Sequence, residues 1–211
     1  MTDNPKTHKK DPYYQQAKRE RYRARSAYKL FEIQKKFNIF KRAYYILDLG
    51  CAPGSWLQVA KKFAESNLTK NKDQYYHRDH YRILGVDIKK VSPIENVQLL
   101  QTNFTKPGFH NHLESFFHAK IDLILSDASI NKTGNSFSDQ IKQVNLCSQI
   151  LTLTETHLKF KGSLVMKTFQ GSDFDKLYRK AKSIFKILKA FKPQSSKKTS
   201  NEIYLIGIRK K

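Results

Sequence analysis

The stretch from Tyr44 to Ala60, YYILDLGCAPGSWLQVA, decides the fold class of this chain. Its apolar start, Tyr45 to Leu47, has the length and composition of a buried strand. Gly50 and Gly54 permit a tight turn and a close approach of backbone to ligand, and Pro53 fixes φ where we expect a helix to begin. Free amides at a helix start favour an electron-rich ligand. The stretch predicts a nucleotide-binding turn, although an ordinary strand-turn-helix connection would have the same pattern.

Strand and helix patterns alternate through the rest of the chain. Apolar runs suited to buried strands occupy 44–49, 82–88, 97–101, 121–127, 163–169, 186–191 and 202–208. Helical patterns occupy 13–24, 27–37, 55–64, 110–118, 137–159 and 173–185, with Asp11 and Ser26 as N-caps and Gly162 as a C-terminal signal for one of them. Alternation with near-continuous apolar strands predicts an α/β fold, in which a mainly parallel sheet has helices on both faces.

Composition narrows the class of protein. The 211 residues suit one domain with a sizeable core, and no apolar run is long enough for a membrane span or a signal peptide. Two cysteines, Cys51 and Cys147, give no disulfide framework, which fits a reducing cytoplasm. His77, His80, His110 and His112 lack the accompanying ligands of a metal site, so we expect none.

The net charge of +22 is concentrated at the two ends of the chain. Residues 1–42 hold 13 Lys/Arg against 4 Asp/Glu, residues 176–211 hold 12 against 1, and the middle is nearly neutral. Basic ends around a neutral core favour binding to a polyanion, because each neutralised phosphate releases counterions. A solvated basic surface is the plainer alternative. Anionic membrane is a weaker one, because no basic segment carries a long apolar face.

Polar side chains stand where the predicted strands end, which is where ligands bind in such sheets. Asp48 could accept hydrogen bonds from a cationic or hydroxylated ligand, and Asp87 is placed to hold a ribose diol. Lys167 interrupts the buried run SLVMKTF, where a lysine is costly unless it is paired or neutral. Asp127 ends the neighbouring strand and could supply the countercharge.

Six blocks, in order, carry a family resemblance: RSAYKLFEIQ (25–34), DLGCAPGSW (48–56), GVDI (85–88), LSDAS (125–129), VMKTFQG (165–171) and KPQSSKKTSNEIYLIG (192–207). Together they resemble the FtsJ-like (RrmJ) ribose 2′-O-methyltransferases of large-subunit ribosomal RNA. The resemblance implies a Rossmann-like sheet of seven strands with the last antiparallel, and S-adenosylmethionine as methyl donor. It also implies a catalytic tetrad, which falls on Lys29, Asp127, Lys167 and Glu202.

The tetrad suits transfer of a methyl group to a ribose hydroxyl, which must be positioned and must lose its proton as the bond forms. We expect Asp127 and Glu202 to flank Lys167, which would act either as a neutral base or as a cation stabilising the alkoxide. Residues 1–42 would form a basic helical extension that packs on the core and contributes Lys29. Residues 43–211 would form the methyltransferase domain.

The same blocks imply the donor contacts, which are Asp48, Gly50, Gly54, Trp56, Asp87, Asn103, Phe104 and Asp127. Three positions depart from the family pattern. Asn103 replaces the usual aspartate near the adenine, Ser55 replaces the second glycine of the turn, and Ile130 stands where proline is common.

The basic ends would bind the RNA substrate. The predicted contacts are Lys18, Arg19, Arg21, Arg23, Arg25, Lys192, Lys197 and Lys198. The resemblance implies a uridine of large-subunit ribosomal RNA, within the ribosomal particle, as target of a cytoplasmic monomer. Transfer RNA is the alternative substrate. A nicotinamide-dependent dehydrogenase would explain the glycine turn and Asp87 but not Lys167, and a non-enzymatic RNA-binding adaptor would explain only the charge.

Overall fold

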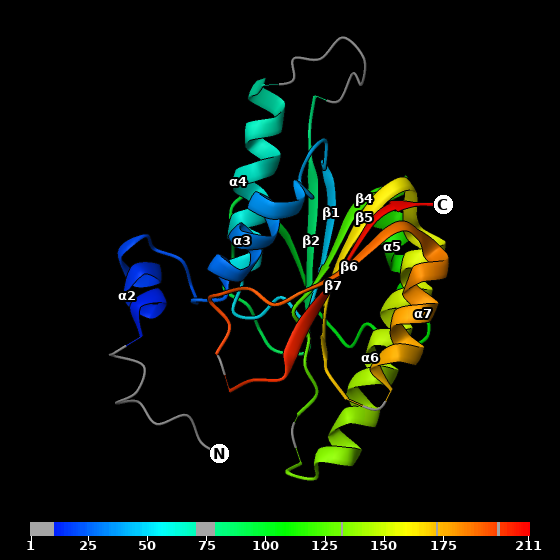
Figure 1. The fold of residues 1–211 in the computed structure, drawn as a ribbon. Helices are drawn as coiled ribbons and strands as arrows, with labels where there is room; N and C mark the ends of the chain where they lie inside the picture. The colour runs from blue at the N-terminus through cyan, green and yellow to red at the C-terminus, as the bar shows by residue number, and fades with distance from the viewer. Residues whose placement is uncertain (1–10, 71–78, 132, 172, 198) are drawn as a thin grey trace.

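The computed structural model of this protein describes residues 11–70, 79–131, 133–171, 173–197 and 199–211 (Figure 1). The described helices are α2 (Pro12–Arg19), α3 (Ala27–Phe37), α4 (Ser55–Lys70), α5 (Phe109–Phe117), α6 (Ser136–His157) and α7 (Phe174–Ile184). The strands are β1 (Tyr45–Leu49), β2 (Arg82–Asp87), β3 (Gln98–Gln101), β4 (Ile121–Ser126), β5 (Leu158–Phe169), β6 (Phe185–Phe191) and β7 (Glu202–Lys210).

The seven strands form one sheet in the order β3-β2-β1-β4-β5-β7-β6. Strands β1 to β5 run parallel, and β7 is antiparallel to both of its neighbours, β5 and β6. The order reverses between β1 and β4, so the parallel strand ends meet there in the way that creates a ligand site in open α/β sheets. The predicted α/β fold with a mainly parallel seven-stranded sheet and an antiparallel last strand is confirmed.

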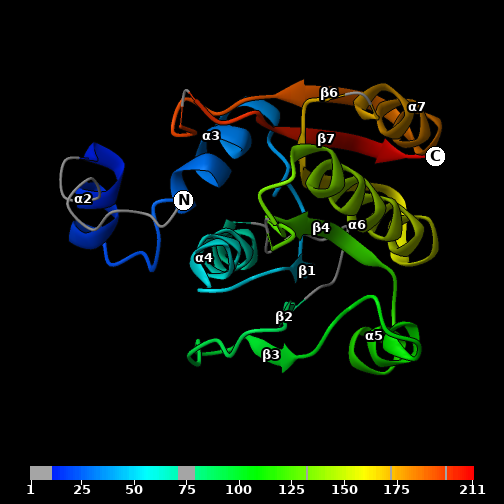
Figure 2. The ribbon, with the colours of Figure 1, turned by 90° about the horizontal axis from the view of Figure 1, so that it is seen from below.

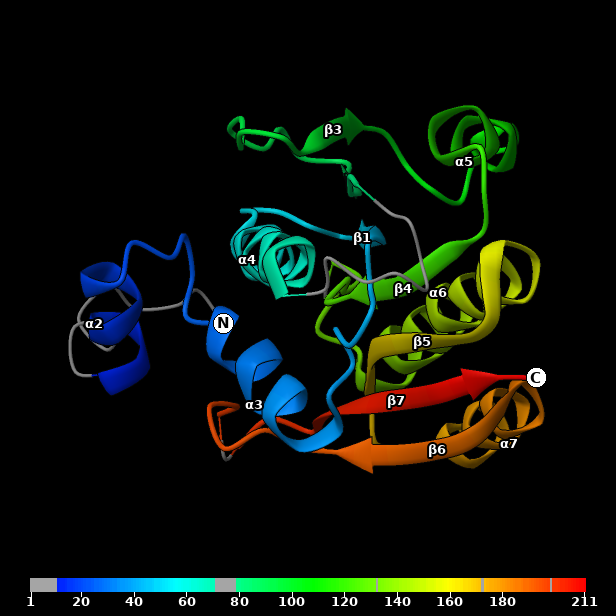
Figure 3. The same cartoon turned by 90° about the horizontal axis from the view of Figure 1, so that it is seen from above.

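Helices cover both faces of this sheet (Figures 2 and 3). On one face α3 and α4 bury Leu30, Ile33 and Leu57 against β1, β2 and β4. On the other face α5, α6 and α7 bury a second cluster that includes Leu113 and Leu151. Residues of β1, β4 and β5 contribute to both clusters, because alternate side chains of a strand point to opposite faces.

The N-terminal part of the chain joins the same core. Asp11 caps α2 by accepting hydrogen bonds from the amides of Tyr13 and Tyr14, as its position predicts. Ser26 precedes α3 but makes no side-chain capping bond. Leu30 of α3 is fully buried against the sheet. A domain boundary at residue 42 therefore stays a prediction, since α3 shares its core with β1.

Strand β5 differs from the prediction at its beginning. The helix before it ends at His157, and Gly162 lies within β5 instead of ending that helix. The pairing of Ile121 with Leu158 is followed by that of Leu123 with Ser163, so the residues between bulge out of the ladder. Gly162 was predicted to end the helix because glycine readily adopts the positive φ found at helix ends. Here Lys161 has the positive φ, of 62°, and Gly162 does not. Among the described residues no helix is long and apolar enough to cross a membrane.

Candidate active site

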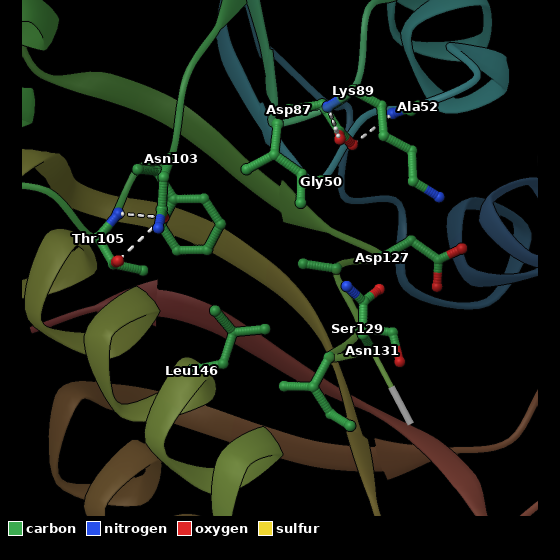
Figure 4. A pocket seen from close by; sticks show the side chains of 14 residues that line it. Gly50, Ala52, Asp87, Lys89, Asn103, Thr105, Asp127, Ser129, Asn131 and Leu146 are labelled. Carbon is green, nitrogen blue, oxygen red and sulfur yellow. Dashed lines mark hydrogen bonds between the residues drawn. The ribbon is translucent and has the colours of Figure 1, made fainter. Parts of the chain in front are cut away.

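A pocket of about 370 Å³ opens where β1, β2 and β4 end (Figure 4). Five predicted donor contacts line it: Gly50, Asp87, Asn103, Phe104 and Asp127. The sequence analysis did not predict the other lining residues as donor contacts, although it named Ile130 as a departure from the family pattern. They are Ala52, Ile88, Lys89, Thr105, Ala128, Ser129, Ile130, Asn131 and Leu146. Most of these residues directly follow the end of a predicted strand, so their position in the sequence could have indicated that they line the pocket. Leu146 comes from α6 and carried no such signal.

The glycine turn is shaped by contact with the end of β4. Gly50 has a φ of +75°, and a Cβ there would lie 2.6 Å from the Cα and Cβ of Ala128. The amides of Gly50 and Cys51 donate to the carbonyl of Val86, at 2.8 and 3.2 Å. These two bonds hold the turn against the end of β2. The predicted ligand-binding amides belong to the start of α4, at Ser55, and that role stays a prediction.

Asp87 is oriented from two sides at the end of β2 (Figure 4). Its Oδ2 accepts a hydrogen bond from the amide of Ala52 at 2.9 Å, and its Oδ1 accepts one from the amide of Lys89 at 2.8 Å. Each carboxylate oxygen has a second lone pair, so these bonds leave capacity for a ribose hydroxyl. The predicted role of Asp87 fits this geometry.

Three predicted donor contacts do not line the pocket. Asp48 is fully buried, and neither of its oxygens has a hydrogen-bond partner among the residues that the structure describes. Burial, and then the charges of Asp127 and Asp87, raise its pKa well above the ordinary value, which favours the neutral acid. Gly54 faces the guanidinium of Arg23. Trp56 is buried and donates its indole N–H to the carbonyl of Ser26 at 2.8 Å.

The three departures from the family pattern have local explanations. Asn103 Oδ1 accepts hydrogen bonds from the amide and hydroxyl of Thr105, which shapes the turn after β3. Ser55 turns its hydroxyl toward that of Ser26, 2.8 Å away, and not toward the pocket. Ile130 has an amide that a proline would lack, and this amide donates to the side chain of Gln143 at 3.1 Å.

Gln143 is a site residue that the sequence reasoning missed. It is buried on α6, and its amide nitrogen contacts the carbonyls of Ala128 at 3.2 Å and Lys167 at 3.4 Å. It thus joins the loop after β4 to the strand that carries Lys167. A lone glutamine within a helical pattern gave no signal for this role.

Lys167 and Asp127 form the first of two ion pairs. The Nζ of Lys167 lies 3.1 Å from Asp127 Oδ1 and donates to the Asp127 carbonyl at 2.6 Å. The Lys167 side chain is 10% exposed, so both bonds offset the cost of burying it. Burial alone would raise the pKa of Asp127, but the charges of Lys167 and Lys29 and the Tyr204 hydroxyl together hold it below its ordinary value.

Lys29 and Glu202 form the second pair, at 2.6 Å. The structure therefore places Glu202 against Lys29, whereas we expected it to flank Lys167. The reason is the register of the strands. Lys167 of β5 lies opposite Tyr204 of β7, whereas Glu202 lies opposite Phe169, two residues further along β5. Lys29 and Glu202 also line a second hollow of about 260 Å³ with Arg25, Ser26, Ser195, Lys197 and Ser200.

Tyr204 joins the two pairs and was also missed. Its hydroxyl donates to Asp127 Oδ1 at 2.7 Å, and the Nζ of Lys29 lies 5.7 Å from its ring centroid. The residue is fully buried and its ring packs beside that of Trp56. The strand pattern of 202–208 predicted an apolar role for this position, so its hydroxyl gave no separate signal.

Helix α3 and the loop before β7 hold each other in place. Glu32 accepts hydrogen bonds from the amides of Gln194 at 2.6 Å and Ser195 at 2.9 Å. Arg25 pairs with Asp11 and donates to the carbonyl of Ser195. These contacts bring the loop, and with it Glu202, to the side of Lys29.

The predicted RNA contacts divide into two groups. Lys18, Arg19, Arg21, Lys192 and Lys197 are exposed. Lys198 lies outside the described residues.

Arg23 and Arg25 are held by the protein itself. Arg23 donates to the carbonyls of Pro53, Ser92 and Pro93 at 3.2, 2.7 and 2.8 Å. Its guanidinium thus fixes the glycine turn, as Arg25 fixes the loop before β7. A structural role therefore accounts for both arginines.

Comparisons with known proteins agree on one family. The model of the FtsJ-like methyltransferase family matches residues 22–210. A protein named ribosomal RNA large subunit methyltransferase E, from Rickettsia akari (strain Hartford), is 38% identical over 203 residues, which are 95% of this chain and 85% of that protein. A crystal structure of a protein described as a ribosomal RNA methyltransferase, from Plasmodium falciparum, is 32% identical, with a TM-score of 0.73 over 90% of this chain and 98% of that one.

A more distant structure shares only the fold. Human methyltransferase-like protein 13, solved in complex with SAH, is 13% identical, with a TM-score of 0.50 over 81% of this chain and 74% of that one. The seven-stranded order of this chain is thus the order of a Rossmann-like methyltransferase sheet.

Proposed function

Since this chain belongs to the FtsJ-like methyltransferase family, we propose that it methylates a ribose 2′-hydroxyl of large-subunit ribosomal RNA. It is a methyltransferase that uses S-adenosylmethionine as donor. The similarity to the relative named for large-subunit ribosomal RNA supports the substrate, because it extends over 95% of this chain.

One observation carries the proposal: the two ion pairs stand between two hollows. Asp127 lines the first hollow, and Lys29 and Glu202 line the second. Lys167 is anchored to Asp127, and Tyr204 links Asp127 to Lys29. A donor in the first hollow and a ribose in the second would both lie beside the linked side chains that include Lys167, and transfer requires the two reactants to be held close together.

The first hollow fits S-adenosylmethionine, which supplies an activated methyl group on a positively charged sulfur. Asp87 would accept hydrogen bonds from the ribose hydroxyls, and Asn103 and Phe104 would contact the adenine. Asp127, held as the anion, would face the positively charged end of the donor. Gly50 would let the backbone approach closely.

Lys167 would contact the 2′-oxygen of the substrate. Its ammonium hydrogens would orient that oxygen and stabilise the negative charge that develops on it, while the hydroxyl proton would pass to water in the open second hollow. Asp127 would hold Lys167 in this position. Lys29, paired with Glu202, would position the ribose from the other side.

Finer features of the substrate follow from the same family relationship. We infer that the target is a uridine in the assembled large subunit, and that the protein acts as a monomer in the cytoplasm. The exposed Lys18 and Arg19 of α2, and the exposed Lys192 and Lys197 of the loop before β7, support RNA binding beside the second hollow. Transfer RNA is the alternative substrate, and the experiment below separates the two.

Replacement of Lys167 by Ala tests the proposal. Loss of the group that stabilises the 2′-oxygen should lower methyl transfer by at least about 100-fold. Transfer from labelled S-adenosylmethionine would be measured on large-subunit particles, on naked ribosomal RNA and on transfer RNA, with ribose methylation mapped by mass spectrometry. Lys176→Ala, at an exposed position on α7, is the control and should leave transfer unchanged.

Three results would contradict the proposal. Undiminished transfer by Lys167→Ala would remove the catalytic assignment. Transfer to transfer RNA alone would remove the ribosomal substrate. Transfer by the wild-type protein to none of these RNAs would remove the proposed function as a whole.

A further inference from the structure

A second basic surface lies at the end of the sheet remote from the donor pocket. It surrounds a hollow of about 590 Å³ lined by Phe160, Lys161, Lys186, Arg209, Lys210 and Lys211, and we call it the distal basic surface. No aspartate or glutamate lines this hollow in the described part of the chain. The mechanism proposed above uses none of its residues.

The bulge in β5 produces this surface. The ladder with β4 breaks between Leu158 and Ser163, and Lys161 has a φ of 62°. A bulge re-aims side chains that would otherwise lie along the sheet. Phe160 is consequently 66% exposed, and the Nζ of Lys161 lies 5.1 Å from its ring centroid.

Like charges are set side by side on the neighbouring strands. Phe185 pairs with Lys210 and Ile187 with Ile208, so Lys186 and Arg209 are neighbours between these pairs, and both are exposed. Like charges opposite each other on two strands cost free energy. An anionic partner would remove that cost, because it neutralises both charges at once.

The chemistry of the surface fits RNA. Cations that follow a backbone and an exposed aromatic ring on which a base can stack are the elements of a single-strand binding surface. We propose that the distal basic surface binds a segment of the ribosomal RNA outside the target nucleotide, with phosphates on Lys161, Lys186 and Arg209 and a base on Phe160. The proposal rests on the proposed function and names a second contact for the same substrate.

Its position sets the length of RNA required. Lys161 and Lys167 lie on the same strand, and because a regular strand rises about 3.3 Å per residue and the bulge shortens this one, they are at most about 20 Å apart. The C-terminal end of β7 and helix α2, with its predicted RNA contacts, stand on opposite sides of the molecule (Figures 1 and 3). An RNA that reaches both must extend across the protein, so a short oligonucleotide around the target would not use the distal basic surface.

Three variants test this proposal by their affinity for RNA. Lys161→Gln with Lys186→Gln should weaken binding of a long ribosomal RNA fragment about tenfold and reduce the slope of log affinity against log salt by about 2, or about 1 for each lost phosphate contact. Phe160→Ala should weaken binding about tenfold, by loss of stacking, without changing that slope. Phe160→Tyr should restore the affinity.

The matched control is Lys176→Gln with Lys180→Gln. It removes the same charge from exposed positions on α7 that line a different groove, between α6 and α7. It should leave affinity for the long fragment within about twofold of wild type, since distant exposed charges are largely screened. All variants should keep the melting temperature, the affinity for S-adenosylmethionine and the rate of transfer at saturating RNA.

Several results would overturn the inference. Equal losses in the surface and control variants would show an effect of net charge alone. Equal losses on short and long RNA would place the contact at the target nucleotide. Loss of binding to phosphatidylserine vesicles with unchanged RNA affinity would point to a membrane. A wild-type protein that methylates no ribosomal RNA would instead refute the proposed function, whatever the surface binds.

Discussion

At the residue scale, two aspartates at the ends of neighbouring strands have opposite properties. Asp127 accepts from Tyr204 and pairs with Lys167, and its pKa is lowered. Asp48 is fully buried and has no hydrogen-bond partner in the described part of the chain, and its pKa is raised well above the ordinary value. Both were predicted from the same pattern, an acid ending an apolar run. Only the surroundings of each side chain separate them.

Asp48 should make the stability of the protein depend on pH. Because the pKa of Asp48 is raised in the folded state, the folded protein keeps a proton on Asp48 that the unfolded chain releases. Stability therefore falls as pH rises from the ordinary pKa of 3.8 through the pKa of the folded state. Asp48→Asn, which mimics the neutral acid, should therefore gain stability relative to wild type as pH increases in urea unfolding experiments. A difference that is constant with pH would contradict this.

Asp139 provides the opposite case as a control. Its carboxylate accepts hydrogen bonds from the amide and hydroxyl of Thr133, which hold its pKa below the ordinary value. The stability that Asp139 contributes is present at pH values above its ordinary pKa, and it is lost as the pH falls through the pKa of the folded state. Asp139→Asn should therefore lose stability relative to wild type as pH increases.

At the scale of elements, the turn between β1 and α4 depends on contacts with three other segments. Gly50 packs on Ala128, Ala52 donates to Asp87, and Pro53 accepts from Arg23. The glycines and the proline identified the turn in the sequence. Its partners are 30 or more residues away along the chain, so local pattern could not supply them.

Gly50→Ala should destabilise the fold and the donor pocket together. The positive φ alone costs about 1 kcal/mol or more for a residue with a side chain, and the new Cβ would also displace Ala128. Gly108→Ala separates the two effects, since Gly108 has a φ of +86° and a Cβ there would have no atom of the described residues within 4 Å. Thermal unfolding should show a larger loss of stability for Gly50→Ala than for Gly108→Ala. In calorimetry, only Gly50→Ala should lose affinity for S-adenosylmethionine.

At the scale of the whole molecule, charge is distributed around a nearly neutral centre. Basic residues from the C-terminal part of the chain, together with Lys161, form the distal basic surface. The pocket where β1, β2 and β4 end is lined by carboxylates, amides and apolar groups, with Lys89 as its one cation among the described lining residues. Folding thus places the residues of this pocket apart from the basic residues that would bind a polyanion. Arg23 and Arg25 are exceptions, because their guanidinium groups bind the protein's own carbonyl and carboxylate groups.

RNA affinity should depend steeply on salt, and donor affinity should not. If the protein makes on the order of six phosphate contacts, affinity for ribosomal RNA should fall about 10³-fold between about 50 and 200 mM salt. Filter binding would measure this, and calorimetry would measure S-adenosylmethionine in parallel. A flat salt dependence of RNA binding would contradict a phosphate-based interface.

The tetrad Lys29, Asp127, Lys167 and Glu202 is what the family resemblance implied, and its catalytic role stays a prediction. The sequence by itself determined the α/β class, the order of most elements and the glycine turn. These follow from periodicity, from glycine and proline positions and from residue types, all of which act over a few neighbours along the chain. The tertiary structure decided which residues meet. It paired Glu202 with Lys29, placed Tyr204 between the two ion pairs and enclosed Asp48.

The physical reason is strand register. A shift of one residue turns a side chain to the other face of the sheet, and the pairing of β5 with β7 joins positions that are more than 30 residues apart in sequence. No local pattern encodes that pairing, nor the bulge that exposes Phe160 on the distal basic surface.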